Sequence, residues 1–224
     1  MTYELEKYIW TDNDFDQMGW HDNRIYQISV AEDLALDIDY IFQWNKPEIE
    51  GLSFTFWVAP ATLVFKNIQN LTFNLDTAFD DAIEIEDIER EVLEKGTLWT
   101  VATHQGDFQF MSDGFQQFIR QEPFFQFGQT IPFLERFGRS VEQTITQSNP
   151  NRFREDFVEQ RKRDLEHFEN VKKRQLKKIE REQLDKLRNN NQIGTKEYLT
   201  QKKEIKDMVD FYDYWLKDTR FDNS

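Results

Sequence analysis

The spacing of the apolar residues changes close to Pro150, and this change limits the possible folds more than any other feature of the sequence. Between Arg24 and about Ile131, apolar and polar residues alternate with a period of two. From Arg152 to about Arg188, the apolar residues follow a helical period, without Gly or Pro. Period-two runs predict strands, and the later pattern predicts a long helix. We therefore predict an α+β chain, with an antiparallel β-sandwich or open barrel followed by a long α-helical hairpin.

The β-rich part contains seven to nine predicted strands at a spacing of roughly ten residues. Its alternating runs cover residues 24–30, 34–40, 52–65, 71–75, 82–88, 96–103, 107–111 and 115–120. Pro60 predicts a bend or an edge position, because proline lacks the N–H donor of a strand ladder. Asp113-Gly114 stands between two alternating runs and predicts a hairpin turn. The phenylalanines near this turn are predicted to lie in the core.

The helical part begins with a short predicted helix over residues 133–147, followed by helices over 152–188 and 195–217. Thr195 is the expected N-cap of the last helix. The longest helix contains an 11-residue repeat, which keeps two apolar rows on one side of it. The rows are Phe157, Phe168 and Ile179, and Leu165, Leu176 and Leu187. We divide the chain into an acidic β-rich domain, residues 1–150, and a charged helical hairpin, residues 151–224.

The charge of the chain is unevenly distributed. The net charge is −14, and it is made up of −17 in residues 1–130 and +3 in residues 131–224. An acidic body repels nucleic acid and anionic membranes and attracts basic proteins. We therefore expect a protein partner, which is basic if charge selects it, and no nucleic-acid or membrane partner. The chain has no cysteine, which excludes disulfides and Cys-ligated metals, and we expect a cytoplasmic location without a signal peptide or transmembrane span.

Several segments carry a resemblance to known proteins. They are Gly19-Trp20-His21-Asp22, residues 36–41 with Trp44, residues 56–65, and residues 112–120 with Pro123. Over about residues 15–130, the chain resembles a family of uncharacterised bacterial β-proteins with a Trp-His-Asp start. This resemblance implies a β-fold and, through some members, an immunity-type role that neutralises a toxin. Residues 184–202 are similar to a short helical-hairpin motif found at bacterial C-termini.

The candidate binding surface consists of Trp20, His21, Asp22, Asp37 and Asp39. Imidazole and carboxylate groups gathered on one sheet face would suit a divalent cation. In the alternative that we favour, Trp20 and His21 cap the sheet and the two aspartates line its solvent face. No residue is assigned as catalytic or as a metal ligand, and no cofactor is expected. His104 is the second histidine open to such a role, because His167 lies among charged residues of a helix.

Two classes of function remain open. The leading hypothesis is a non-enzymatic, protein-binding role, of the immunity type if the resemblance holds, with self-association of the hairpin as a variant. The alternative is a metal- or ligand-binding β-domain with hydrolase activity. Basic triplets at 161–163 and 172–174 recur every 11 residues, but nearby acids predict solvated ion pairs rather than a nucleic-acid surface.

Overall fold

The computed structural model describes residues 3–76, 83–94 and 96–222, and the chain divides into two compact units. The β unit comprises Met1–Asn45 and Phe54–Arg152, and the hairpin unit comprises Lys46–Ser53 and Phe153–Ser224. Within the hairpin unit, the short loop segment is held by Gln175, whose side-chain amide donates to the Glu50 carbonyl at 2.9 Å. Among the described residues, no helix has the length and apolar character needed to cross a bilayer.

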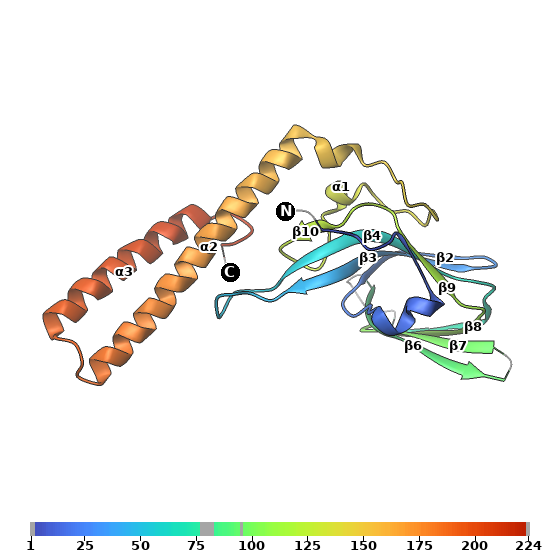
Figure 1. Cartoon of the computed structure of the whole chain (residues 1–224), viewed down its shortest axis with the longest axis horizontal. Coiled ribbons are helices and arrows are strands. Elements are labelled where there is room, and N and C mark those ends of the chain that lie inside the picture. Colours follow the sequence, from blue (N-terminus) through green and yellow to red (C-terminus); the bar gives the residue numbers. More distant parts are fainter. Residues whose placement is uncertain (1–2, 77–82, 95, 223–224) are drawn as a thin grey trace. The chain divides into compact units, whose positions relative to one another are not determined.

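The β unit is built on an antiparallel open sheet, which confirms the predicted α+β class with antiparallel strands (Figure 1). Its described strands are β1 (Ile9–Thr11), β2 (Arg24–Val30), β3 (Leu34–Asn45), β4 (Thr55–Phe65), β5 (Gln69–Leu75), β6 (Ile83–Leu93), β7 (Gly96–Thr103), β8 (Gly106–Ser112), β9 (Phe115–Ile119) and β10 (Phe124–Gln126). These ten exceed the seven to nine predicted, because β1 and β10 are too short to show alternation. The strand order is β1-β9-β4-β3-β2-β6-β7-β8-β5, and β10 pairs with β4.

The sheet consists of two halves joined at a narrow seam. The first half runs from β1 to β2 and the second from β6 to β5, and only Arg24↔Glu84 and Ile25↔Ile83 pair across β2 and β6. The halves lie over one another, with β3 and β4 in the upper layer of Figure 1 and β6 and β7 in the lower. Phe65 of β4 packs against Phe110 of β8, their ring centroids 4.7 Å apart. The aromatic core therefore fills the space between the halves.

Pro60 lies inside the continuous strand β4, which corrects the predicted bend or edge. β4 pairs with β10 over Phe56–Val58 and with β9 over Ala61–Phe65, so Pro60 stands where one neighbouring strand gives way to the next. The Pro60 carbonyl accepts from the Arg120 amide on this side, at 3.0 Å. Because the nitrogen and carbonyl of a residue point to the same side of a strand, the missing donor falls in this gap and costs no ladder bond.

The Asp113-Gly114 turn does not form the predicted hairpin. β8 pairs with β7 and β5, whereas β9 pairs with β4 and β1, so the turn carries the chain from one half of the sheet to the other. The amide of Asp113 donates to the Lys66 carbonyl at 3.1 Å, and the Lys66 amide donates to the Gly114 carbonyl at 2.9 Å. The turn is thus paired with the β4–β5 corner, a partner that local sequence does not reveal.

The segment after β10 is mostly extended, which corrects the helix predicted over residues 133–147. Helix α1 covers only Phe133–Arg136, and it ends because Phe137 adopts a left-handed conformation with φ 66°. The chain then runs across the outer face of β3 and β4. Val141 packs there against Ala35, Val64 and Phe118. The 3₁₀ turn η1 (Asp12–Gln17) also belongs to this unit, and a second 3₁₀ turn, η2 (Pro150–Phe153), includes the last residues of the unit and the first of the next.

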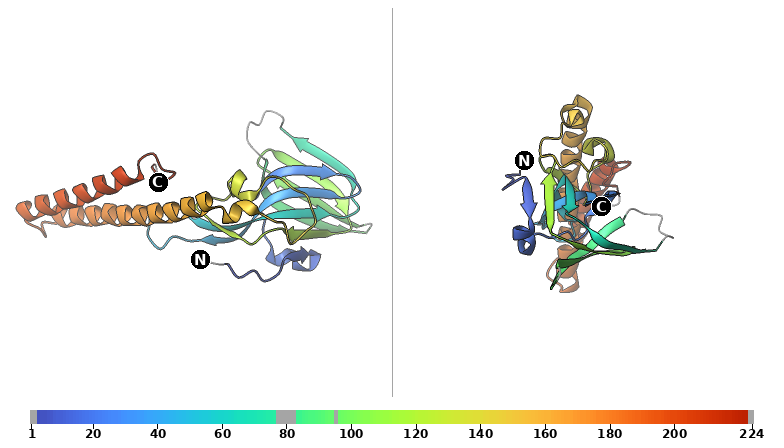
Figure 2. Two further views of the ribbon diagram at one scale, coloured as in Figure 1. Left: turned by 90° about the horizontal axis from the view of Figure 1, so that it is seen from above. Right: turned by 90° about the vertical axis from the view of Figure 1, so that its right-hand side faces the viewer.

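The hairpin unit contains α2 (Glu155–Asn189) and α3 (Thr195–Leu216), which run antiparallel in contact, as predicted (Figure 2). Gly194, not Thr195, is the N-cap of α3. The buried apolar residues are Val171 and Leu184 of α2 and Ile205, Tyr212 and Leu216 of α3. The leucine row of the repeat remains exposed. Lys162, Lys172 and Lys177 form ion pairs with glutamates three residues away, in agreement with the predicted solvated pairing.

Candidate functional site

The turn before β2 carries the first three residues of the predicted surface, Trp20, His21 and Asp22, but their side chains do not share one surface. Trp20 is 2% exposed. Its indole N–H donates to the Gln117 side-chain oxygen at 2.8 Å, and its ring lies 5.6 Å from that of Phe115. It is therefore a core anchor rather than a contact surface. The side chain of His21 is 65% exposed, and Asp22 has a left-handed backbone with φ 63°.

Asp37 and Asp39 are fully buried in the middle of β3, so the prediction that they line a solvent face is wrong. Asp37 accepts from Arg120 at 2.6 Å and also binds Arg136. Asp39 accepts from the Nε of Arg136 at 2.8 Å and from the Tyr26 hydroxyl at 2.8 Å. The two aspartates contact these groups rather than His21 or Asp22.

This buried network is closed by backbone donors of the segment that covers the sheet. The amide of Ile131 donates to Asp39 at 2.8 Å, and the amide of Ser140 donates to Asp37 at 2.9 Å. Two carboxylates facing two guanidinium groups leave no formal net charge. These hydrogen bonds and ion pairs hold residues 120–140 against β3. The carboxylate oxygens of Asp37 and Asp39 are all occupied by partners within the network.

Burial dominates the electrostatics of this network. Burial raises the pKa of Asp39 above its ordinary value, against the opposing effect of Arg136. Burial lowers the pKa of Arg120, against the opposing effect of Asp37. Burial, together with the charge of Asp39, raises the pKa of the Tyr26 hydroxyl. A tyrosine held in its protonated form can keep donating to Asp39, which is a structural role.

His21 and Asp22 belong to a different group of residues at the seam between the two halves of the sheet. Potential ligand atoms of Asp22, Glu84 and His104 all lie within 4.8 Å of one another, and we call these three residues the seam cluster. His104 Nε2 is 3.5 Å from Glu84 Oε1, and His21 Nδ1 is 2.8 Å from Asp22 Oδ1. The sequence pointed to His21, Asp22 and His104 but missed Glu84. The β2–β6 pairing that brings Glu84 here is not encoded locally.

The solvent side of the second half of the sheet is acidic. Trp99 and Val101 of β7 point into the core, so the alternate residues and their cross-strand partners face outward. These outward residues include Asp87, Glu89 and Glu91 of β6, Leu98, Thr100 and Ala102 of β7, and Asp107, Gln109 and Met111 of β8. Arg90, the only basic residue of the described strands β5–β8, lies on the inner side, over the Phe15 ring at 4.2 Å. We call this surface the acidic face.

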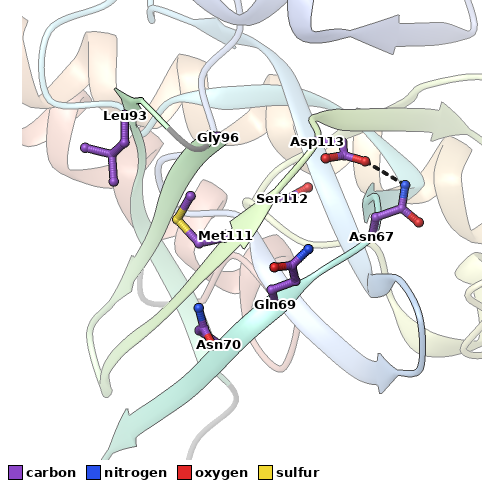
Figure 3. A pocket seen from close by; sticks show the side chains of 8 residues that line it. All are labelled: Asn67, Gln69, Asn70, Leu93, Gly96, Met111, Ser112 and Asp113. Carbon is purple, nitrogen blue, oxygen red and sulfur yellow. Dashed lines mark hydrogen bonds between the residues drawn. The ribbon is translucent and has the colours of Figure 1, made fainter.

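A shallow pocket of about 340 Å³ lies at one end of the acidic face (Figure 3). It is lined by Asn67, Gln69, Asn70, Leu93, Gly96, Met111, Ser112 and Asp113. Asn67 donates to Asp113 at 2.7 Å across its rim. Gly96, with φ 132°, lies beside the Met111 side chain, and the absence of a side chain there leaves room for the pocket. The lining is partly polar, from the side-chain amides of Asn67, Gln69 and Asn70, and partly apolar, from Leu93 and Met111.

Comparison with known proteins finds no matching family model, no matching curated protein and no matching solved structure.

Proposed function

We propose that the chain is a non-enzymatic binding protein whose acidic face receives a basic surface of a partner protein. The observation that carries this proposal is the distribution of charge on β5–β8. Three acids of β6 point outward on one strand, and Asp107 lies across the sheet from Asp87 through Ala102. No Lys or Arg accompanies them on the described part of this face. Such a surface steers a basic partner and repels nucleic acid and anionic lipid.

The partner's contact chemistry follows from the pocket beside these acids. Leu93 and Met111 provide an apolar lining, and Gln69, Asn70 and Asn67 provide amide groups. A lysine or arginine opposite Glu89 and Glu91, followed by an apolar side chain in the pocket, would match both regions. Apolar contact at such a pocket adds affinity to the charge-driven encounter.

The resemblance described above adds a biological reading to this proposal. Toxin-neutralising proteins of the immunity type act by covering a surface of their toxin, which requires binding and no catalysis. A toxin domain with a basic surface is therefore the partner that we expect. The fully paired buried aspartates support a non-enzymatic role, because Asp37 and Asp39 are committed to Arg120 and Arg136.

The proposal is tested by affinity capture from extracts of the source cells, with Glu89→Lys/Glu91→Lys as the decisive variant. We expect the original protein to retain a basic protein that this variant loses. Glu166→Lys/Glu182→Lys changes the net charge equally, but on exposed positions of α2, and should retain the partner. The recovered partner is then purified and its affinity is measured by calorimetry. Capture of no partner, or equal binding by both variants, would contradict the proposal.

Self-association through the hairpin is a second candidate, favoured by the exposed leucine row. Leu165, Leu176 and Leu187 are exposed at regular 11-residue spacing. The two helices together carry 15 Lys/Arg and 14 Asp/Glu, so two copies would meet without net repulsion. Light scattering should show a dimer that becomes a monomer when the three leucines are changed to Gln. A monomeric original protein at high concentration would dismiss this candidate.

A further inference from the structure

We propose that the seam cluster is a binding site for a divalent first-row transition-metal ion, of which Zn²⁺ is the test case. Asp22, Glu84 and His104 are the ligands, and His21 is a positioning residue that holds Asp22. This site is separate from the proposed protein-binding function and does not depend on it. It would link three segments of the β unit: the turn before β2, the start of β6 and the β7–β8 turn.

The distances within the seam cluster suit a single ion. Zinc–ligand distances near 2.0–2.2 Å place neighbouring ligands of a tetrahedral site about 3.4 Å apart. His104 Nε2 and Glu84 Oε1 are already 3.5 Å apart. The remaining ligand atoms lie within 4.8 Å, so a small side-chain rotation brings all three to bonding distance.

Backbone hydrogen bonds fix the three ligands relative to one another. The Asp22 amide donates to the Ile85 carbonyl at 2.8 Å, directly after Glu84. The His104 amide donates to the Glu84 carbonyl at 3.1 Å. The Glu84 amide donates to the side-chain oxygen of Gln105 at 3.1 Å. The ligands come from three separate segments, yet little backbone ordering remains to oppose binding.

The chemistry of the donors selects the class of metal. Two carboxylates balance the charge of a divalent ion, and an imidazole nitrogen favours zinc and its neighbours over Mg²⁺ or Ca²⁺. Arg24, opposite Glu84 across the seam, lies over the Tyr26 ring with its guanidinium carbon 5.7 Å from the centroid. The His104 side chain is 49% exposed, so water can complete the coordination.

Asp22 is oriented by two side chains that leave its oxygens able to bind metal. His21 Nδ1 lies 2.8 Å from Asp22 Oδ1, and the side-chain amide of Gln129 donates to Asp22 Oδ2 at 2.6 Å. Each carboxylate oxygen can accept more than one bond, so a lone pair remains for the ion. Partners that orient a ligand in this way commonly contribute 10–100-fold to metal affinity, by order of magnitude.

The test is calorimetric titration of the full chain, without an affinity tag, using zinc chloride. We expect one Zn²⁺ per chain and no displacement by equimolar Mg²⁺. At a hundredfold excess of Zn²⁺ over Kd, the thermal midpoint should rise by roughly 5–10 °C. His104→Ala and Asp22→Asn should each weaken binding by about 100-fold, and His21→Ala by about 10-fold.

Two matched variants separate this site from the many other acids and from the remaining histidine. Glu86→Gln lies two residues from Glu84, and His167→Ala lies on α2 in the other unit; both should bind Zn²⁺ as the original protein does. Circular dichroism checks that each variant is folded. If a ligand variant does not fold, the imidazole NMR signals of the original protein decide, because Zn²⁺ should shift His104 and not His167. Absence of zinc binding, or full affinity in folded His104→Ala, would overturn the proposal.

Discussion

Arg136 shows how one residue can hold a long segment in place. Its guanidinium group binds both Asp37 and Asp39 and also donates to the carbonyl of Ile38 at 3.1 Å. Arginine suits this position because its planar group offers five donors in a fixed geometry. The two aspartates were visible in the sequence as outward residues of a strand. Arg136, about a hundred residues later, was not recognisable as their partner.

Changing Arg136 to Met should lower the free energy of unfolding by about 3–5 kcal/mol, because it leaves two carboxylates buried beside a single remaining arginine. Such a loss is a large share of the stability of an ordinary domain. Urea unfolding measures it. Arg154→Met is the matched control, because Arg154 forms an exposed pair with Asp156 and should matter little. A loss below about 1 kcal/mol for Arg136→Met would contradict this role.

A second residue-scale prediction concerns pH. The Lys66 ammonium group, 2.9 Å from Asp33, holds the pKa of Asp33 below its ordinary value. A carboxyl whose pKa is lowered in the folded state stabilises the fold above its ordinary pKa, and this contribution is lost as the pH falls toward the folded value. Asp33→Asn should therefore cost about 1 kcal/mol at neutral pH, and this cost should shrink as the pH falls below the ordinary pKa of the carboxyl and through its lowered folded value. Urea unfolding of both proteins across this range tests the sign, since a difference independent of pH would refute it.

At the scale of elements, local patterns predicted the strands and helices well but not their partners. The alternation in residues 34–40 and 96–103 identified β3 and β7, and the hairpin was expected from the helical period. The Asp113-Gly114 turn was misjudged, because its partner is Lys66, which is distant in the sequence. The cover over β3 was missed for the same reason: extended residues after Arg136 have no periodic signal.

The α2–α3 contact can be tested with two leucines of the same helix. Leu184 is 3% exposed and Leu176 is 50% exposed. Leu184→Ala removes buried methyl groups and should lower the free energy of unfolding by about 2–5 kcal/mol, whereas Leu176→Ala should cost less than about 1 kcal/mol. The helical circular-dichroism signal during urea unfolding reports both values. Equal losses for the two variants would mean that the buried face of α2 is assigned incorrectly.

At the scale of the whole molecule, the uneven charge is the property that most affects association. The net charge is −14, and the acidic face concentrates part of it on one surface. Charge-driven association weakens as salt shortens the screening length, from about 10 Å at 0.1 M to about 3 Å at 1 M.

The seam cluster and the acidic face both depend on pairings between strands that are distant in the sequence, so neither site could be predicted from local sequence alone.

The affinity for the captured basic partner should fall as salt rises from about 0.05 to about 0.5 M, because the acidic face acts through long-range charge. The association rate should fall more than the dissociation rate rises, which stopped-flow measurement separates. Any residual affinity of the Glu89→Lys/Glu91→Lys variant should depend less on salt than the affinity of the original protein. An affinity that does not change with salt would favour a partner selected by apolar contact.

The buried ion network also affects how the chain folds during synthesis. Asp37 emerges from the ribosome long before its partners, since Arg120 and Arg136 lie 83 and 99 residues further along the chain. Before Arg120 and Arg136 have been synthesised, burial of the face of β3 that carries Asp37 and Asp39 would leave two carboxylates without a compensating charge, at a high free-energy cost. The nascent strand therefore stays hydrated on that face and resists premature collapse and edge-to-edge aggregation. The two aspartates thereby keep the outer face of β3 open to water until the covering segment has been made.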